Sequence, residues 1–180
     1  MSILKVARMG HPVLRTRAQA IERADIKSAA VQRLIDDMID TMTEYHGVGL
    51  AAPQVHESLR LFVVAFDPSQ PEPDDDQPLE SVAIINPEIT PLGDEMVEDW
   101  EGCLSIPDIR GRVPRLGDLG LRAYDRKGER FEVRLRNFQA RVIQHETDHL
   151  DGVLFFDRMR SFDSLAFLDE YSRYWAKDRD

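Results

Sequence analysis

The sequence contains a single cysteine, Cys103, among 180 residues, which excludes an intrachain disulfide framework. A lone thiol is typical of a reducing compartment. No apolar run reaches the length of about 18 residues that a membrane helix needs, and charge interrupts the first residues, so we expect no signal peptide. Basic residues number 23 against 33 acidic ones, and the net charge of −10 argues against binding along a nucleic-acid backbone. We therefore expect a cytoplasmic protein.

Hydrophobic residues make up 42 % of the chain, enough for one compact domain over residues 1–180. The segment 67–80 differs from the rest, because it holds four prolines and six acidic residues and no basic residue. We expect it to form an exposed loop. A Ca²⁺ site at Asp74, Asp75 and Asp76 is the alternative, but these residues lack the alternating ligand spacing and the closing Glu of such a site.

Hydrophobic periodicity predicts helices near both ends of the chain and strands between them. Apolar residues at three- and four-residue spacing predict a helix from Ala29 to a stop at Gly47. The other predicted elements are a strand at 61–66, a strand at 82–86 ended by Pro87, a hairpin of 121–125 with 131–135, a helix at 137–150 with Asn137 as N-cap, and an amphipathic core-packing helix at 164–175. This order of elements is typical of an α+β protein.

The strongest chemical signal runs from His145 to His149 and reads His-Glu-Thr-Asp-His. Residues i and i+4 of a helix lie on one face, about 6 Å apart along the axis, so both imidazoles can bind one metal ion. Glu146 can then lie beside a water molecule on that ion and accept its proton. Two surface histidines are the simpler alternative, but neighbours such as Val142 and Leu150 indicate a buried helix.

Two imidazoles require a third protein ligand, and the sequence offers two sources. The third histidine of a metzincin is missing, because its position holds Phe155. A downstream carboxylate, Asp169 or Glu170, would complete a zincin-type site. Cys103 is the upstream candidate, because a metal ion turns a nearby thiol into a thiolate, which is a strong ligand. Gly102 beside it allows a close backbone approach.

A third motif, Gly47–Gln54, reads Gly-Val-Gly-Leu-Ala-Ala-Pro-Gln and presents one amide after several small residues. Alone it fits a helix end followed by a close-packed turn equally well, and it lacks the lysine of a phosphate-binding loop. Together the three motifs resemble the peptide deformylase family, which carries GxGxAAxQ, EGCLS and HExDH in this order. The resemblance covers about residues 4–158.

The resemblance implies an α+β fold in which small antiparallel or mixed sheets pack around a central helix that carries the His-Glu-x-x-His motif. It implies a metal-dependent hydrolase that removes the formyl group from the N-terminal methionine of newly synthesised polypeptides, its partners. Cys103, His145 and His149 would bind one divalent ion, Fe²⁺, for which Zn²⁺, Ni²⁺ or Co²⁺ can substitute. Glu146 would serve as the general base and then as the general acid.

In the family pattern, the Gln54 amide and the Leu104 backbone N–H would donate hydrogen bonds to the developing oxyanion. The substrate-binding positions that the resemblance implies are Val48, Gly49, Gly102, Arg110, Phe138, Arg141 and Val142. Arg141 departs from the pattern, because an aliphatic residue is common there. We expect its stem to line the methionine pocket while its head reaches water.

Several neighbouring residues have expected roles of their own. Trp100 either packs in the core or contacts the substrate pocket. Asp148 is not a ligand if Cys103 is one, and we expect it to form a salt bridge to Arg115. Residues 158–180 hold five basic and five acidic side chains. This balance predicts weak or absent electrostatic docking of the tail to the ribosome.

Two other functions remain as alternatives at this point. A zincin-type metallopeptidase would use Asp169 or Glu170 as its third ligand and would not need Cys103. A non-catalytic binding or metal-storage module would need no general base, so the intact Glu146 argues against it.

Overall fold

The computed structural model describes residues 2–70 and 80–176. The proposed Ca²⁺ ligands at 74–76 and most of the acidic segment 67–80 lie outside these residues. The helices and strands, with 3₁₀ helices labelled η, are η1 (Pro12–Arg15), η2 (Arg23–Asp25), α1 (Ala29–Glu44), β1 (Gly49–Ala51), η3 (Ala52–Val55), β2 (Leu61–Val64), β3 (Val82–Pro91), β4 (Met96–Cys103), β5 (Ile106–Leu116), β6 (Asp118–Tyr124), β7 (Arg130–Arg136), α2 (Asn137–Leu150), η4 (Phe155–Arg158), β8 (Ala166–Phe167) and α3 (Leu168–Tyr174). The expected α+β class is confirmed.

Five strands form an antiparallel sheet in the order β1-β2-β3-β6-β7. The residues of β2 are all buried, which explains the uninterrupted apolar run in the sequence. The predicted hairpin is β6 with β7, where Leu121 pairs with Val133. Gly128 in its turn has a φ of 73°, a backbone conformation that favours glycine.

The prediction that Pro87 ends a strand is wrong, because β3 continues through it to Pro91. The pairing with β6 shifts register between Ile85 and Glu88, and Asn86 adopts a φ of 50°. A bulge of this kind accommodates a proline, which has no N–H to donate to the neighbouring strand. The Asn86 side chain donates to Ile21 O at 2.8 Å and accepts from Ile21 N at 3.0 Å, tying the N-terminal segment to the bulge.

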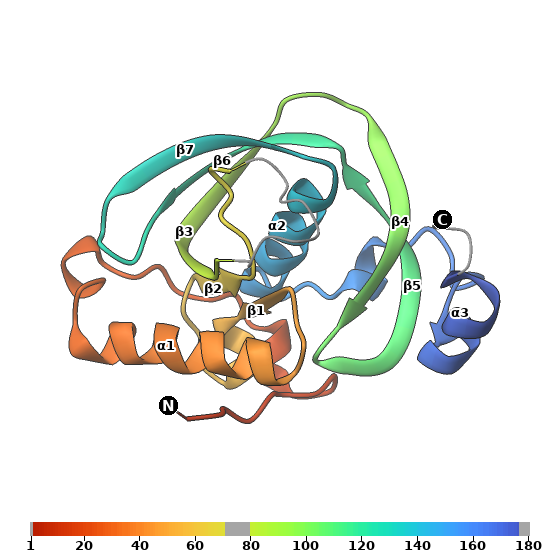
Figure 1. Ribbon diagram of the computed structural model, residues 1–180, viewed down its shortest axis with the longest axis horizontal. Helices are drawn as coiled ribbons and strands as arrows, with labels where there is room; N and C mark the ends of the chain where they lie inside the picture. The colour runs from red at the N-terminus through yellow and green to blue at the C-terminus, as the bar shows by residue number, and fades with distance from the viewer. Residues whose placement is uncertain (1, 71–79, 177–180) are drawn as a thin grey trace.

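A second antiparallel sheet has the order β4-β5-β8, and sequence periodicity did not predict it. Strands β4 and β5 pair from Met96–Leu116 to Cys103–Ile106, with a register shift between Glu101 and Cys103. In Figure 1 this hairpin curves around one side of α2. Its turn carries the second motif of the sequence to the centre of the molecule.

Helix α2 lies between the two sheets (Figure 1), and 12 of its 14 residues are buried. It spans the predicted residues and is followed, as expected, by Gly152 with a φ of 73°. The prediction that Asn137 is the N-cap is wrong by one position, because the N-cap is Arg136. The Asn137 backbone N–H donates to Gly117 O at 3.1 Å, which fixes the entry of the chain into the helix.

The long N-terminal helix α1 follows its prediction closely. The Ser28 hydroxyl accepts from Val31 N at 3.4 Å as an N-cap. Four apolar side chains at three- and four-residue spacing are buried against one face of the five-stranded sheet: Val31, Ile35, Met38 and Met42. The opposite face of that sheet packs on α2. The sheet therefore separates α1 from α2 and holds α2 in the interior.

The prediction of a core-packing helix at 164–175 is wrong in its bounds and its role. Ala166 and Phe167 form β8 and pair with Arg110 and Ile109 of β5. The helix that follows, α3, has no buried residue among Leu168–Tyr174. Its apolar stripe therefore rests on the outside of the second sheet rather than in the core.

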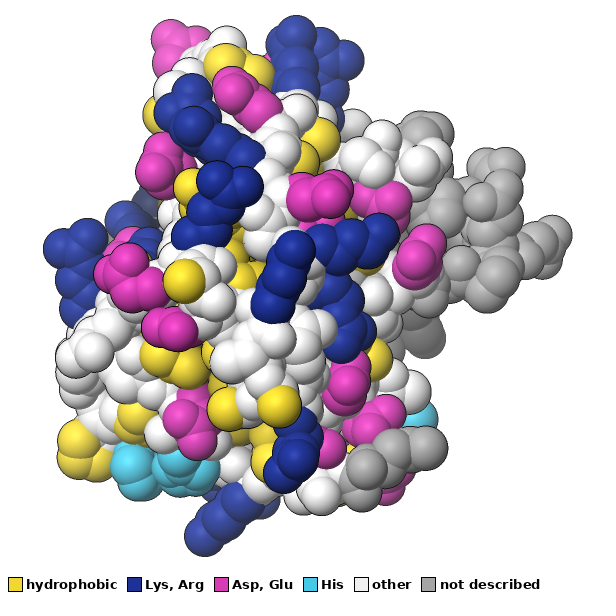
Figure 2. Space-filling model, turned by 90° about the vertical axis from the view of Figure 1, so that its left-hand side faces the viewer, with side chains coloured by type: hydrophobic (Ala, Val, Ile, Leu, Met, Phe, Trp, Pro, Cys, Tyr) yellow, Lys and Arg dark blue, Asp and Glu magenta, His cyan; other side chains and the backbone are white. Residues whose placement is uncertain are grey.

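None of the helices in the described part of the chain is long and apolar enough to cross a membrane. On the face shown in Figure 2, Lys and Arg side chains lie beside Asp and Glu. Ion pairs along the large sheet include Arg122 with Glu88 and Glu132, and Arg134 with Asp118. Such pairs on an exposed surface contribute little to stability.

Candidate active site

Helix α2 supplies three neighbouring side chains of the candidate site. His145, Glu146 and His149 are at most 9 % exposed. The helix packs against the large sheet on one side and β5 on the other, so one face is turned toward the β4–β5 turn. The i, i+4 spacing puts the two imidazole rings 5.0 Å apart, centroid to centroid.

Cys103 reaches the same point from the end of β4. Its Sγ lies 3.2 Å from His149 Nε2. Ligand atoms of Cys103, His145 and His149 lie within 4.8 Å of one another, and no other such metal-binding group is found among the described residues. The alternative ligands Asp169 and Glu170 belong to α3 and are not part of this group.

These three side chains fit a divalent metal ion. Metal–sulfur bonds of about 2.3 Å and metal–nitrogen bonds of about 2.0 Å place tetrahedral ligand atoms roughly 3.3–3.7 Å apart. The Cys103–His149 distance of 3.2 Å is close to that range without any movement of the backbone. A thiolate with two imidazoles is also a donor set that suits zinc and iron-group ions.

Glu101 holds one of these imidazoles in place. Its Oε2 lies 2.9 Å from His145 Nδ1, which leaves Nε2 free to face a metal ion. The Arg115 guanidinium donates to both carboxylate oxygens, each at 2.9 Å. Burial alone would raise the pKa of Glu101, but its hydrogen bonds with His145 and Arg115 outweigh burial and lower that pKa far below its usual value.

The expected salt bridge between Asp148 and Arg115 is confirmed. Asp148 also accepts two hydrogen bonds from Arg158, at 2.7 and 3.1 Å. Arg115 thus joins the carboxylates of β4 and α2, the two elements that carry the metal-binding side chains. Its own side chain is 4 % exposed.

The expectation that the Arg141 head reaches water is wrong. Its guanidinium donates to Glu101 Oε1 at 2.7 Å and to three backbone carbonyls, Val97 O at 2.6 Å, Val113 O at 2.8 Å and Asp99 O at 3.5 Å. The residue is 7 % exposed. These acceptors of the β4–β5 hairpin offset the cost of burying the Arg141 charge, because a buried charge needs hydrogen-bond partners.

Glu146 lies beside the three metal-binding side chains without a direct cationic partner. Its Oε2 has no hydrogen-bond partner among the described residues. Burial raises the pKa of this carboxyl to about 7. Gly49 of β1 makes room for it, because an added Cβ would lie 2.7 Å from Glu146 Cδ, closer than side-chain carbons approach in proteins.

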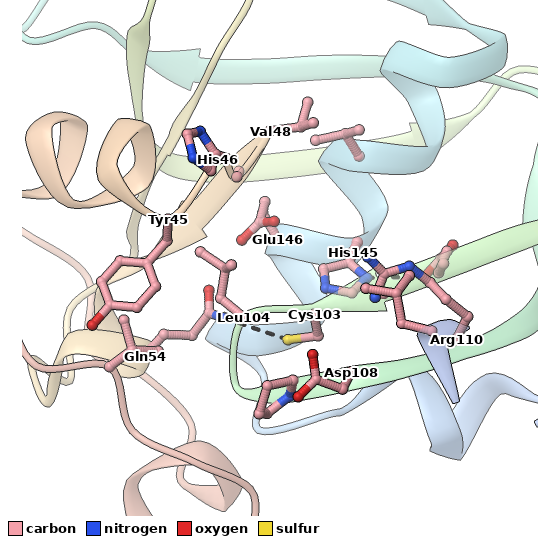
Figure 3. Close-up of a pocket in the computed structure, with 18 of the residues that line it drawn as sticks. Tyr45, His46, Val48, Gln54, Cys103, Leu104, Asp108, Arg110, His145 and Glu146 are labelled. Carbon is pink, nitrogen blue, oxygen red and sulfur yellow. Dashed lines mark hydrogen bonds and ion pairs between the residues drawn. The ribbon is translucent and has the colours of Figure 1, made fainter. Parts of the chain in front are cut away.

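The amide of Gln54 is oriented by two bonds from its surroundings. Its Oε1 accepts from Ala51 N at 2.8 Å, and its Nε2 donates to Ser105 Oγ at 3.1 Å. The same Nε2 lies 3.5 Å from Cys103 Sγ. Figure 3 shows the Gln54 amide pointing toward Cys103 with Leu104 beside it. The amide N–H₂ group therefore faces the metal-binding side chains.

These side chains lie at the floor of a cavity of about 720 Å³. Every residue to which the family resemblance gave a catalytic, substrate-binding or metal-binding role lines this cavity, except His149, which is 1 % exposed. Val48 and Phe138 are 40 % and 53 % exposed at its walls. Gly102 leaves space for the Arg110 side chain, whose Nε would lie 2.7 Å from an added Cβ.

Further lining residues were not assigned to the site from the sequence. They are Lys5, Val6, Arg8, Tyr45, His46, Gly47, Trp100, Glu101, Pro107, Asp108 and Leu168. Most come from segments outside the three motifs, such as the N-terminal arm and α3, and only tertiary contacts bring them there. Trp100 is the exception, because a contact with the substrate pocket was one of its two expected roles, and it lines this cavity.

A buried His-Glu-x-x-His helix with a cysteine beside it, opening onto a substrate-sized cavity, defines a metal-dependent hydrolase. The comparisons with known proteins narrow this class. The family model described as polypeptide deformylase matches residues 3–164. This chain belongs to the polypeptide deformylase family.

Named relatives and solved structures agree with the family. Peptide deformylase 2 of Nostoc sp. is 44 % identical, over 98 % of this chain and 97 % of that protein. Peptide deformylase 1 of Bordetella pertussis is 41 % identical, over 91 % of this chain and 92 % of that protein. The Met-Ala-Ser-bound class I type b peptide deformylase of Acinetobacter baumannii has a TM-score of 0.78 and 39 % identity, covering 88 % of this chain and 100 % of that chain. The peptide deformylase of Thermotoga maritima has a TM-score of 0.78 and 38 % identity, covering 89 % of this chain and 100 % of that chain.

Proposed function

We propose that this chain removes the N-formyl group from the N-terminal methionine of newly synthesised polypeptides, releasing formate. The observation that supports this most is the meeting of Cys103, His145 and His149 beside buried Glu146 at the floor of the cavity. The family carries out this reaction, and the chain spans nearly the whole length of the relatives it matches.

Cys103 Sγ and one nitrogen each of His145 and His149 would hold one divalent metal ion, which we propose to be Fe²⁺, with Zn²⁺, Ni²⁺ or Co²⁺ able to replace it. When bound, this ion would polarise the formyl carbonyl and lower the pKa of a water molecule beside it. Glu101 would keep the His145 ring in the orientation that binding requires, through its bond to Nδ1.

Glu146 would move the proton in this reaction. Its carboxylate would accept a proton from the attacking water and then deliver it to the nitrogen of the leaving methionine. A pKa of about 7 suits both steps near neutral pH, because the group can accept and release a proton there. The space over Gly49 lets the carboxylate stand at the cavity floor.

Gln54 and Leu104 would stabilise the negative charge that develops on the formyl oxygen. The Ala51 N–H fixes the Gln54 amide so that its donor end faces the cavity. The Leu104 backbone N–H, one residue after Cys103, would be the second donor. Donors held in place before the reaction cost no reorganisation when the charge forms.

The remaining cavity residues would hold the peptide. Val48, Phe138, Val142 and the stem of Arg141 would surround the methionine side chain, because they give the wall apolar surface. Gly49 and Gly102 would contact the peptide next to Glu146 and Arg110, whose side chains occupy the space beside these two glycines. Arg110 would lie toward the rest of the peptide.

One peptide offered in two forms tests the proposal. Formyl-Met-Ala-Ser should release formate, and free Met-Ala-Ser should remain intact under the same conditions. Cleavage of a peptide bond in either form would instead favour a metallopeptidase. Metal content near one ion per chain with neither activity would favour a binding module.

We place this activity in the cytoplasm, where formylated polypeptides leave the ribosome. The near balance of charge in residues 158–180 supports only weak electrostatic contact of this segment with the ribosome. Tight co-sedimentation with ribosomes that is lost when residues 164–180 are removed would contradict this. Direct nucleic-acid binding is not expected at a net charge of −10.

A further inference from the structure

The C-terminal segment reaches the cavity although it lies beyond the match to the family model, which ends at residue 164. Strand β8 pairs with β5 through Ala166–Arg110 and Phe167–Ile109. The hydroxyl of Ser164 accepts a hydrogen bond from Arg112 N at 3.0 Å. These contacts fix the start of α3 beside the cavity residue Arg110, as Figure 1 shows for α3 and β5.

Aromatic contacts hold α3 against the cavity rim. The Trp100 ring lies 4.8 Å from the Tyr171 ring and 5.9 Å from the Trp175 ring, centroid to centroid. Trp100 and Leu168 both line the cavity, one from β4 and the other from the first turn of α3. The ring contacts anchor the helix, and Leu168 is left half-buried at the wall.

The placement of α3 is not explained by the core. None of its residues from Leu168 to Tyr174 is buried, so the helix adds little to the hydrophobic interior. It does add apolar surface to a cavity that must also hold the part of the substrate beyond methionine. That cavity, at about 720 Å³, is larger than one methionine side chain requires.

We propose that Trp100 and Leu168 form an apolar subsite for a side chain downstream of the formylmethionine. The enzyme then prefers peptides with a large apolar residue at position two or three over peptides with alanine or aspartate there. This inference rests on the proposed function and assigns the C-terminal segment a part in substrate selection. The occupant is the substrate peptide, because the apolar wall is continuous with the catalytic cavity.

The wild-type enzyme is first tested with two peptide series, formyl-Met-X-Ser and formyl-Met-Ala-X, in which X is Ala, Leu, Phe or Asp. In one series, kcat/KM for Leu or Phe should exceed that for Ala by about 10-fold, a typical effect of added apolar contact in a pocket. Formate release from formyl-Met-Ala-Ser is measured alongside. Its absence would contradict the proposed function, whereas equal kcat/KM for all X would overturn only the subsite.

The Leu168→Ala variant then tests the wall itself. The ratio of kcat/KM for X = Leu over X = Ala should fall to near one, because the ratio compares two substrates in the same protein. Tyr174→Ala is the matched control, since Tyr174 is a 62 % exposed residue of the same helix that does not line the cavity. It should keep the wild-type ratio.

Two results would overturn the subsite. The first is an unchanged ratio in Leu168→Ala; if size-exclusion chromatography then also shows an altered oligomeric state, this apolar face is a contact between copies. The second is an equal loss in Leu168→Ala and Tyr174→Ala, because this would reflect general loosening of α3.

Discussion

At the residue scale, Glu146 has the surroundings expected of a proton carrier. It is 4 % exposed, and its Oε2 lacks a partner among the described residues. Glu146→Gln keeps the shape but cannot accept a proton, so formate release should fall about 10²- to 10⁴-fold. Metal analysis should still find one ion per chain. A metal-loaded variant with near-normal rates would remove Glu146 from this role.

The buried Arg141 side chain joins three elements of the fold. It stands on α2, yet its guanidinium bonds to Glu101 and to carbonyls on both β4 and β5. Arg141→Met should lower the free energy of unfolding by about 3 kcal/mol, because buried acceptors lose their donor. Urea denaturation measures the change.

The control for Arg141 is Arg134→Met, which removes an exposed arginine paired with Asp118 at the protein surface. Surface ion pairs contribute little, so its denaturation midpoint should stay near the wild-type value. An equally small change in Arg141→Met would contradict the view that its buried bonds join the hairpin to α2.

At the scale of elements, the sequence predicted those helices and strands that local capping and apolar periodicity determine. Helix α1 has a capping serine and a regular apolar stripe, and the sequence predicted it within a few residues. The β4–β5 hairpin was missed, because β4 runs Met-Val-Glu-Asp-Trp-Glu-Gly-Cys and its first three residues are exposed. Pairing along β5, rather than burial of alternate residues, holds it in place. The prediction that a strand ends at Pro87 failed for a related reason, because pairing with β6 continues β3 beyond this residue.

The residues of the candidate site also fall into a group that the sequence predicted and a group that it did not. Cys103, Glu146 and Gln54 could be picked out because their motifs are short and contiguous in the sequence. The buried bonds of Arg141 and the contribution of Leu168 could not, because they depend on how β4, β5 and α3 come together. Long-range packing decides these contacts, and the periodicity of the sequence does not report it.

The close contact between β1 and α2 can be tested at Gly49, which lies against the Glu146 side chain. Gly49→Ala would place a methyl group 2.7 Å from Glu146 Cδ, too close for contact, so the carboxylate must move. A displacement of about 1 Å at a reacting group can cost about 10²-fold in rate. We expect such a loss in kcat, with metal content unchanged.

The matched control for Gly49 is Gly93→Ala, because no atom of the described residues lies within 4 Å of the Cβ that it would add. Its kcat should equal that of the wild type. Normal turnover by Gly49→Ala would show that Glu146 does not need the space over β1.

At the scale of the whole molecule, the proposed metal site lies where α2 meets the end of β4. Its three candidate ligands come from these two elements, so we expect a bound ion to stabilise the folded chain and not the unfolded one. At a free metal concentration of 100 times Kd, this amounts to about 2.7 kcal/mol. Chelation should therefore lower Tm by roughly 5–10 °C in a chain of this length.

Differential scanning calorimetry with and without chelator measures this shift. Cys103→Ala should show a smaller shift, since one ligand is missing. An unchanged Tm in a wild-type protein proven free of metal would contradict a metal site that links α2 to the end of β4.

We expect the same site, when it holds iron, to make the enzyme sensitive to oxygen. One thiolate and two neutral imidazoles leave a divalent ion with a net charge of about +1, and the thiolate raises electron density on it. A position open to substrate is also open to O₂. Iron should therefore oxidise and leave, and the bare Cys103 thiolate can then be oxidised to sulfenic and sulfinic acid. Nickel lacks this ready oxidation.

We therefore expect the iron-loaded enzyme to lose activity in air and the nickel-loaded enzyme to keep it. Cys103 is the only cysteine, and the sequence has six methionines, so peptide mass spectrometry can tell damage at the site from general oxidation. Added oxygen should appear on Cys103 before it appears on exposed methionines such as Met9, which is 50 % exposed. Oxidation of Met9 with Cys103 intact would mean that inactivation begins elsewhere. An air-stable iron enzyme in which Cys103 binds the metal would contradict the redox argument itself.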